Sequence, residues 1–275
     1  MHSIKDKYRK MNEEFGERKA RGYVDAKFYP GHPVGLKNFL REKMLLHMLN
    51  ASKADKVLDV GCASGRQSFL IAEKRAEVTG IDISNNFVKQ ATSSVKKYGA
   101  NNISFMVADI ESLPFPPDHF DKILCAEILE HVLNLDDAMN QLLGVLKPGG
   151  LLVISVPNEN GKGTLWQRVK TLILKERFSP LEDFSLQGIE RHGDAHLRIF
   201  NQKTITGFLR LYPLDILAIR GCDIIDFPLY DRVLGILLIS RTFRTMWLKT
   251  ELVLAQLGIM KLLSRHLVLS AIKRI

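Results

Sequence analysis

The sequence predicts an α/β protein built on a doubly wound, mostly parallel β-sheet. The first observation is the stretch 57–65, in which a short apolar strand turns through Gly61 and Gly65 into a helix. The second is that short apolar segments alternate with helical segments along the chain, which is typical of βαβ units. The third is strand 77–82, which ends in the acid Asp82. A glycine turn followed by a strand-end carboxylate is an arrangement that binds nucleosides in such sheets.

Hydrophobic periodicity and turn residues define the elements in order. Ser84 and Gly99 are the expected N-cap and C-cap of one helix, and the Lys-Pro-Gly-Gly run 147–150 is expected to end another. The predicted elements are helix 36–50, strand 56–60, helix 66–75, strand 77–82, helix 84–98, strand 103–107, strand 120–125, a helix from Asp136 or Asp137 to Leu146, strand 151–156, helix 202–211, strand 214–222 and strand 266–273.

Composition is that of an ordinary globular protein. The chain has 275 residues, of which 46% are hydrophobic and 25% are charged, enough for one large α/β domain with insertions. Its cysteines, Cys62, Cys125 and Cys222, are odd in number and far apart, which favours a reducing compartment over a disulfide framework. The N-terminal residues do not resemble a signal peptide, and the longest apolar run is too short to span a bilayer. We therefore expect a cytoplasmic protein.

Charge is unevenly distributed along the chain. The net charge is +9, and both ends of the sequence are basic while the central part is mildly acidic. Basic flanks suit an anionic partner, either a membrane surface or a phosphorylated substrate. An ordinary solvated surface explains them equally well.

The glycine turn does not match a dinucleotide site. A nicotinamide fingerprint needs glycine at the first, third and sixth positions, which are Gly61, Ala63 and Arg66 in this chain. A wider set of motifs, in this order, resembles the class I S-adenosylmethionine-dependent methyltransferases: 57–65, Gly80-Ile-Asp82, Ala108-Asp-Ile110, Phe120-Asp121 and Leu146-Lys-Pro-Gly-Gly150. The resemblance covers residues 36–157 clearly and 196–275 loosely. It implies a seven-stranded sheet whose last strand is antiparallel.

The resemblance also implies roles for individual residues toward S-adenosylmethionine. Gly61 and Gly65 approach the amino-acid portion of the cofactor, and Asp82 accepts both ribose hydroxyls. Asp109 accepts from the adenine amine. The physical chemistry agrees, because a cofactor without phosphate needs carboxylates and a shaped pocket rather than cations. The remaining residues assigned to the cofactor pocket are Asp59, Cys62, Ile83, Ile110 and Ala126.

A second cluster, Glu127-Ile-Leu-Glu130-His131, follows the fourth strand of the core. Positions i, i+3 and i+4 are expected on one face of a helical turn at the mouth of the site. Together with Pro157-Asn158 and a distant His196, the cluster resembles two methyltransferase groups. One is the ubiquinone-pathway O-methyltransferases, and the other is the small-RNA 3′-terminal 2′-O-methyltransferases, in which these residues coordinate a metal.

Two chemical roles and a purely structural one remain open for this cluster. In the first, Glu127, Glu130, His131 and His196 hold a divalent metal (Mg²⁺, Mn²⁺ or Zn²⁺), with His192 as a weaker candidate ligand. In the second, His131 or His196 acts as a general base without metal and Glu130 supports it through hydrogen bonds. A hydroxyl nucleophile needs one or the other, because its proton must be removed or its pKa lowered.

The remaining segments are expected to select the acceptor. One domain is predicted, with an N-terminal helical segment (1–50), a cofactor-binding core (51–157) and a substrate-side region (158–275). Helices are predicted at 5–21 and 164–178, with a loop at 22–35. The apolar and basic stretch 228–264 suits either peripheral contact with a membrane or a helical cap against the sheet or a second subunit, which makes a homodimer one expectation.

The predicted function is therefore methyl transfer from S-adenosylmethionine. The acceptor is expected to be a hydroxyl of a small amphipathic, quinone-like or glycan- or lipid-linked molecule. The alternatives are an RNA 2′-O-methyltransferase, disfavoured because no RNA-binding platform is evident, and a non-catalytic scaffold subunit with the same fold. A nicotinamide oxidoreductase is disfavoured by Arg66.

Overall fold

The computed structural model describes residues 33–159, 197–222 and 264–275, together with Met246, Lys249, Thr250, Val253 and Lys261. The predicted helices 5–21 and 164–178 and most of the stretch 228–264 lie outside these residues. The elements are α2 (Pro33–Leu49), β1 (Lys56–Val60), α3 (Arg66–Ala72), β2 (Glu77–Asp82), α4 (Asn85–Tyr98), β3 (Ile103–Val107), β4 (Phe120–Ala126), the 3₁₀ turn η2 (Leu129–His131), α5 (Leu135–Val145), β5 (Leu146–Pro157), α8 (Gln202–Leu209), β6 (Leu214–Cys222) and β7 (His266–Lys273).

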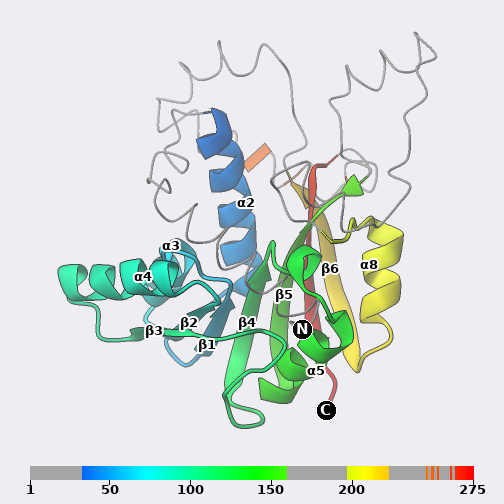
Figure 1. Cartoon of the computed structure of the whole chain (residues 1–275). Coiled ribbons are helices and arrows are strands. Elements are labelled where there is room, and N and C mark those ends of the chain that lie inside the picture. Colours follow the sequence, from blue (N-terminus) through cyan, green and yellow to red (C-terminus); the bar gives the residue numbers. More distant parts are fainter. Residues whose placement is uncertain are drawn as a thin grey trace, which may run out of the picture.

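The strands form one seven-stranded sheet in the order β3-β2-β1-β4-β5-β7-β6 (Figure 1). Strands β1 to β5 pair in parallel, whereas β7 runs antiparallel to both β5 and β6. The predicted fold class, including the antiparallel last strand, is confirmed.

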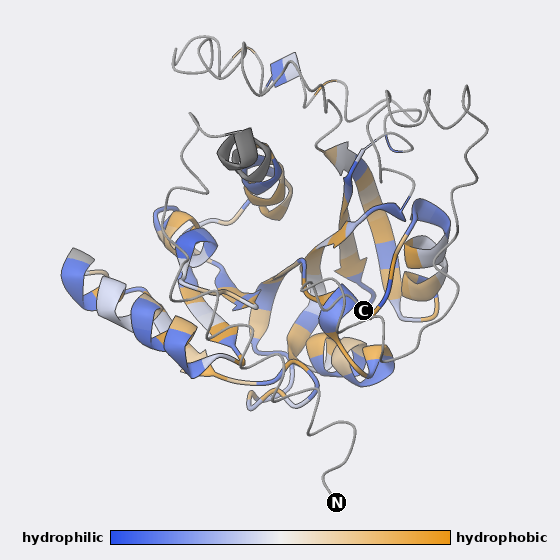
Figure 2. Ribbon diagram, turned by 45° about the horizontal axis from the view of Figure 1, so that its top comes forward, coloured by the Kyte–Doolittle hydropathy of each residue, from blue (hydrophilic) through white to orange (hydrophobic). Residues whose placement is uncertain are grey.

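Both faces of the sheet are covered by helices. Along β1, Val57 belongs to the hydrophobic cluster shared with α2 and α3, while the next residue, Leu58, belongs to the cluster shared with α5 and α8. This alternation follows from the two-residue period of a strand, and burial on both faces explains why the successive residues Val57 and Leu58 of β1 are both apolar. In Figure 2 the hydrophobic colour concentrates on the strands and on the helix sides that face them.

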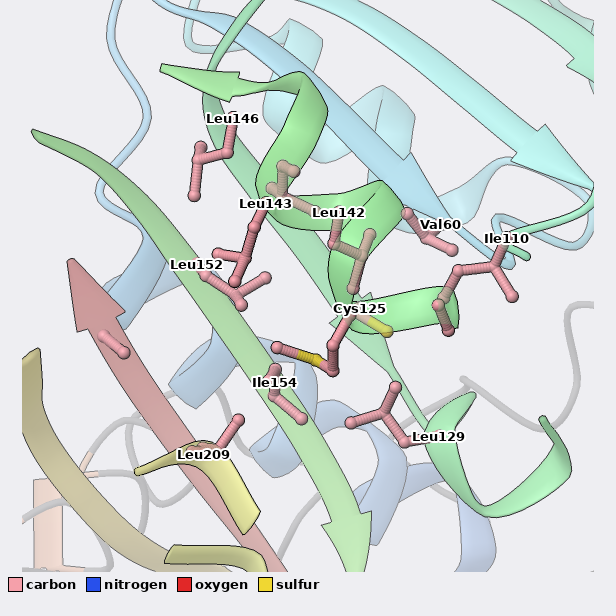
Figure 3. Close-up of a cluster of buried hydrophobic side chains, with 14 of the residues drawn as sticks. Val60, Ile110, Cys125, Leu129, Leu142, Leu143, Leu146, Leu152, Ile154 and Leu209 are labelled. Atoms are coloured by element: carbon pink, nitrogen blue, oxygen red, sulfur yellow. The ribbon is translucent and has the colours of Figure 1, made fainter. Parts of the chain in front are cut away.

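The cluster on the α5 side contains leucines from three kinds of element. Figure 3 shows Leu142 and Leu143 of α5 near Leu152 of β5, and Leu129 of η2 next to Ile154 of β5. Leu129 is fully buried in this cluster. The 3₁₀ turn that carries the second acidic motif is therefore anchored in the core by its apolar residue.

Several element ends differ from prediction. Helix α2 begins at Pro33, inside the predicted loop, because proline is well tolerated in the first turn of a helix. Helix α3 ends at Ala72 rather than at residue 75, where Arg75 has a left-handed φ of 67°. Strand β5 begins at Leu146, so the Lys-Pro-Gly-Gly run lies within the strand as an irregularity between the pairs Phe120–Leu146 and Lys122–Leu151.

The topology gathers several chain segments at one edge of the sheet. The carboxyl ends of the five parallel strands β1 to β5 lie there together. Because β7 is antiparallel, its first residue, His266, reaches the same edge, where it pairs with Pro157 of β5 and Cys222 of β6. This is the edge at which ligands bind in open α/β sheets.

Within the described residues, no helix is long and apolar enough to cross a membrane. Met246, Lys249, Thr250 and Val253 are helical and exposed, and they are the main described part of the stretch 228–264.

The packing of Gly80 gives a prediction about stability. A Cβ at Gly80 would lie 2.5 Å from the Phe105 ring, so we expect Gly80→Ala to destabilise the protein by about 1–3 kcal/mol. In a Phe105→Leu background the same change should cost less than half as much. Gly207→Ala in α8 is the matched control, since its Cβ would meet open space. Urea unfolding measures wild type, the three variants at Gly80 and Phe105 and the Gly207→Ala control, and an equal cost of Gly80→Ala in both backgrounds would contradict the steric explanation.

Candidate functional site

The turn after β1 has three residues with left-handed backbone conformation. Their φ angles are 70° at Gly61, 47° at Ala63 and 88° at Gly65. Ala63 carries a Cβ, so its conformation costs about 1–2 kcal/mol that glycine would avoid. The turn is tied to β2, because the amide of Cys62 donates to the carbonyl oxygen of Ile81 at 2.9 Å.

Side chains of the protein itself lie against two of the motif glycines. A Cβ at Gly65 would meet the ring of Phe105 at 2.6 Å, and a Cβ at Gly61 would meet Ile128 Cδ1 at 1.9 Å. The absence of a side chain at these positions therefore has a packing reason. Their predicted approach to the cofactor stays a prediction.

Asp82 turns its carboxylate toward the glycine turn. Oδ2 accepts from the amide of Ala63 and Oδ1 accepts from the amide of Ser84, both at 2.9 Å. Burial raises the pKa of Asp82, and backbone donors from Ser84, Ala63 and Ile83 act in the opposite direction. The bond to Ala63 fixes the strained turn and leaves the carboxylate at the carboxyl edge of β2.

Asp59 lies beneath the turn and is almost completely buried. Its Oδ2 accepts from the hydroxyl of Ser68 in α3, while Oδ1 has no partner among the described residues. Burial raises the pKa of Asp59 to about 7, assisted by the negative charge of Asp82. Through its contact with Ser68, Asp59 links β1 to α3, the helix that follows the turn.

The third acid, Asp109, forms a turn after β3. Its Oδ1 accepts from the amide of Glu111 at 3.0 Å, and Ile110 is buried in the core near Val60. Glu111, which the sequence reasoning did not select, accepts from the amides of Leu133 and Asn134. This contact joins the predicted adenine loop to the segment that follows η2.

The other predicted pocket residues occupy the same edge. Ile83 follows β2, and Ala126 ends β4. Cys62 is buried, and its thiol pKa is raised by burial and by the charges of Asp59 and Asp82, which makes it a poor nucleophile. Their contacts with a cofactor remain predictions.

Glu127 is held by three elements at the end of β4. Its Oε1 accepts from the hydroxyl of Ser155 in β5 at 2.7 Å. Its Oε2 lies 3.4 Å from Arg41 Nη1 of α2 and 3.2 Å from His266 Nε2 of β7. Burial acts to raise the pKa of Glu127, but the charges of Arg41 and His266 outweigh it and hold that pKa well below its usual range.

Glu130 has the opposite environment. Its side chain is 0% exposed, and neither carboxyl oxygen has a hydrogen-bond partner among the described residues. Burial and the charge of Glu127 raise its pKa well above the usual range. The pKa values of two carboxyl groups three residues apart are thus shifted in opposite directions, a pattern seen where acid–base chemistry occurs.

The expected geometry of the second motif is corrected by the structure. Glu127 does not belong to a helical turn with Glu130 and His131, because its φ of 58° is left-handed and η2 begins only at Leu129. That conformation costs about 1–2 kcal/mol at a residue other than glycine. The three side chains therefore do not lie on one face of a helix.

The distant histidines, His192 and His196, lie outside the described residues. The adjacent Leu197 is placed, and its amide donates to the carbonyl oxygen of Glu130 at 2.8 Å. Arg198 donates to the carbonyl oxygens of Val132 and Leu133. Leu197 and Arg198 are thus attached to the η2 segment, and the predicted role of His196 stays a prediction.

A metal centre is not evident in the described part of the chain. No group of three or more His, Cys, Asp or Glu side chains there converges to hold an ion. Oε2 of Glu127 instead faces the guanidinium of Arg41.

Sequence reasoning missed three residues of this site: Arg41, Ser155 and His266. Arg41 lies in a helix far upstream, and Ser155 is a short polar residue inside an apolar strand. His266 carried the clearest signal, since the first residue of an antiparallel last strand must lie at the edge where the parallel strands end.

The pKa of Asp59 predicts a pH effect on stability. The carboxyl group is protonated more readily in the folded state (pKa about 7) than at its ordinary value of 3.8, so stability is lost as pH rises from about 4 to 7. The full loss is about 4 kcal/mol. We expect Asp59→Asn not to show this loss of stability. The difference in unfolding free energy, variant minus wild type, should therefore rise from about pH 4 to 7. Urea unfolding of the ligand-free proteins at several pH values measures the difference, which a pH-independent value would contradict.

Comparisons with known proteins extend these observations. A methyltransferase-domain family profile matches residues 51–185. A ubiquinone biosynthesis O-methyltransferase of Coxiella burnetii is 35% identical over 134 residues, which cover 49% of this chain and 56% of that relative. Methyltransferase GfsG of Streptomyces halstedii is 36% identical over 115 residues, 41% of each chain. The chain thus matches about half the length of these curated relatives.

Solved structures support the same fold across more of the chain. A methyltransferase bound to the Trm112 activator of Haloferax volcanii has a TM-score of 0.60 at 19% identity and covers 96% of this chain and 99% of its own. An S-adenosylmethionine-dependent methyltransferase from Aquifex aeolicus has a TM-score of 0.56 at 14% identity, covering 93% and 97%. With its strand order, glycine turn and strand-end carboxylates, the chain has the fold of the class I S-adenosylmethionine-dependent methyltransferases, and its residues 51–185 belong to a methyltransferase-domain family.

Proposed function

We propose that this protein transfers the methyl group of S-adenosylmethionine to a hydroxyl group of a small amphipathic acceptor. The observation that carries the proposal is Asp82, a buried carboxylate at the end of β2 that faces the glycine turn through the amide of Ala63. A carboxylate at this position can accept two hydroxyl donors from a ribose through charge-assisted bonds.

The charge of the site suits this cofactor. Asp59 lies in β1, Asp82 ends β2 and Asp109 follows β3, so acids gather where a phosphate-containing ligand would require donors or cations instead. S-Adenosylmethionine carries no phosphate, and its sulfonium and ammonium groups are positive. Negative side chains around the turn therefore favour it.

The chemistry at the acceptor requires little covalent work from the protein. When bound, the cofactor supplies an electrophilic methyl group, which moves from sulfur to the acceptor oxygen while the hydroxyl proton leaves. The protein aligns the two reactants and receives the proton. We propose that His131 or His196 receives the proton and that Glu130 supports it through hydrogen bonds. This role of Glu130 is supported by its two carboxyl oxygens, which lack partners among the described residues.

The class of acceptor is proposed from the name of one relative and from the position of the chain junctions at the edge of the sheet. A quinone-like or lipid-linked acceptor is supported by the name of the Coxiella relative, which acts in ubiquinone biosynthesis. The chain leaves the described core after Glu159 and returns at Leu197 and Ser264. Backbone hydrogen bonds hold these junctions together: the amide of Asn158 donates to the carbonyl oxygen of Arg265, and the amide of Glu159 donates to the carbonyl oxygen of Phe200. The segments between them therefore start and end at the edge where Glu130 lies.

Two alternative functions remain, methylation of RNA and a non-catalytic scaffold role. Two further expectations, a homodimer and membrane contact through 228–264, are compatible with the proposed function. No specific observation on the described residues favours any of the four.

Cofactor binding tests the proposal directly. We expect Asp82→Asn to weaken S-adenosylmethionine binding by about 10–100-fold, because replacing the carboxylate loses charge-assisted bonds of about 1.5–3 kcal/mol each. The control is Glu77→Gln at the opposite, exposed end of β2, which should bind like wild type. Isothermal titration calorimetry measures all three proteins. Absence of binding to the wild-type protein would refute the proposed function.

The metal hypothesis fits the described residues poorly. A divalent ion at Glu127 would meet the permanent charge of Arg41, and Oε1 is already bonded to Ser155.

Metal removal is the corresponding experiment. We expect EDTA to leave the affinity for S-adenosylmethionine unchanged, and titration with Mn²⁺ or Zn²⁺ to show no saturable binding of one ion per chain. A stoichiometric site that disappears in Glu127→Gln would restore the metal hypothesis.

A further inference from the structure

Glu127 has an unusual conformation for its position. It follows a central parallel strand directly, yet its φ of 58° lies in the left-handed region that favours glycine. Non-glycine residues keep such conformations only where surrounding contacts determine them, and those contacts gather at functional sites. The reason for the conformation must therefore be found in the partners of Glu127.

Those partners come from three separate elements. The amide of Glu127 donates to the carbonyl oxygen of Ser155 at 3.0 Å, and the hydroxyl of the same serine donates to Oε1. On the other carboxylate oxygen, Arg41 Nη1 and His266 Nε2 lie side by side, 2.8 Å apart. We call Arg41, Ser155 and His266 the Glu127 clamp. It joins α2, β5 and β7 at one carboxylate.

The turn at Glu127 decides where the following residues lie. Ile128 packs over Gly61, with Cδ1 in the space that a Cβ of that glycine would occupy. Leu129 enters the core, and Glu130 is buried immediately after it. A change in the backbone of Glu127 would therefore move Ile128 against the glycine turn.

We propose that His266, together with Arg41, is a positioning residue for the cofactor site: it holds Glu127 in the left-handed turn and thereby sets Ile128 over Gly61. His266 acts through Glu127 and Ile128 and has no direct contact with the cofactor in this proposal. The inference rests on the proposed function, because its main measurement is the affinity for S-adenosylmethionine.

Glycine at position 127 makes the left-handed backbone conformation independent of the Glu127 clamp. Glu127→Gly adopts a left-handed φ without help from side chains, so the contribution of His266 should disappear in that background. His266→Ala removes the contact, while His266→Gln keeps a polar group that can accept from Arg41 and donate to Glu127. These variants form a double-mutant cycle with an internal rescue.

Calorimetric titration with S-adenosylmethionine gives the first readout. In the wild-type background we expect His266→Ala to weaken binding about fivefold and His266→Gln to stay within about twofold, a coupling typical of residues in contact. In Glu127→Gly, His266→Ala should change the affinity less than about twofold. A fivefold loss in both backgrounds, or in neither, would overturn the proposal.

The melting temperature of the ligand-free proteins gives the second readout, which needs no cofactor. His266→Ala should lower it in the wild-type background and leave it nearly unchanged in Glu127→Gly, whereas equal shifts in both would overturn the clamp. If the wild-type protein failed to bind the cofactor while this thermal cycle held, the proposed function would fail and the clamp would stand.

Discussion

Burial of β1 on both faces is the constraint on which the rest of the structure depends. Val57 and Leu58 are fully buried in opposite hydrophobic clusters, and β1 is paired in parallel with β2 and β4. A strand enclosed in this way must leave the sheet by a sharp turn at its carboxyl end. The two flanking strands end beside it for the same reason, so the turns that carry Gly61, Asp82 and Glu127 meet at one edge.

That edge concentrates negative groups where solvent is scarce. Burial raises the pKa of Asp59, Asp82 and Glu130, which shows that their charged forms are disfavoured in the ligand-free protein. The pKa of Glu127 is lowered instead, because Arg41 and His266 lie against its carboxylate. A positively charged ligand would stabilise the charged forms of the other three carboxyl groups in the same way. The site thus has an electrostatic preference before any ligand binds, and fold stability is lowered by the groups that create the preference.

Much of the fold could be predicted, because apolar strands buried on both faces and helices of ordinary length have distinct sequence periods. The predicted start of β5 was wrong for a physical reason. Leu146 pairs with Phe120 across the Lys-Pro-Gly-Gly irregularity, a contact between residues distant in sequence. The helical geometry expected for Glu127, Glu130 and His131 was wrong as well, because local spacing carries no information about a left-handed φ that partners from three other elements hold in place.

The sequence by itself determined the fold class, the glycine turn and the strand-end acids, since each depends on local periodicity or on short motifs around 57–65, Asp82 and Asp109. Only the tertiary structure decided in which direction the pKa of each carboxyl group is shifted, because that depends on burial and on neighbours such as Arg41 and His266. It also decided that Phe105 and Ile128 pack against the glycines. The antiparallel direction of β7 brings His266 to Glu127, and long-range pairing of this kind is absent from any local pattern.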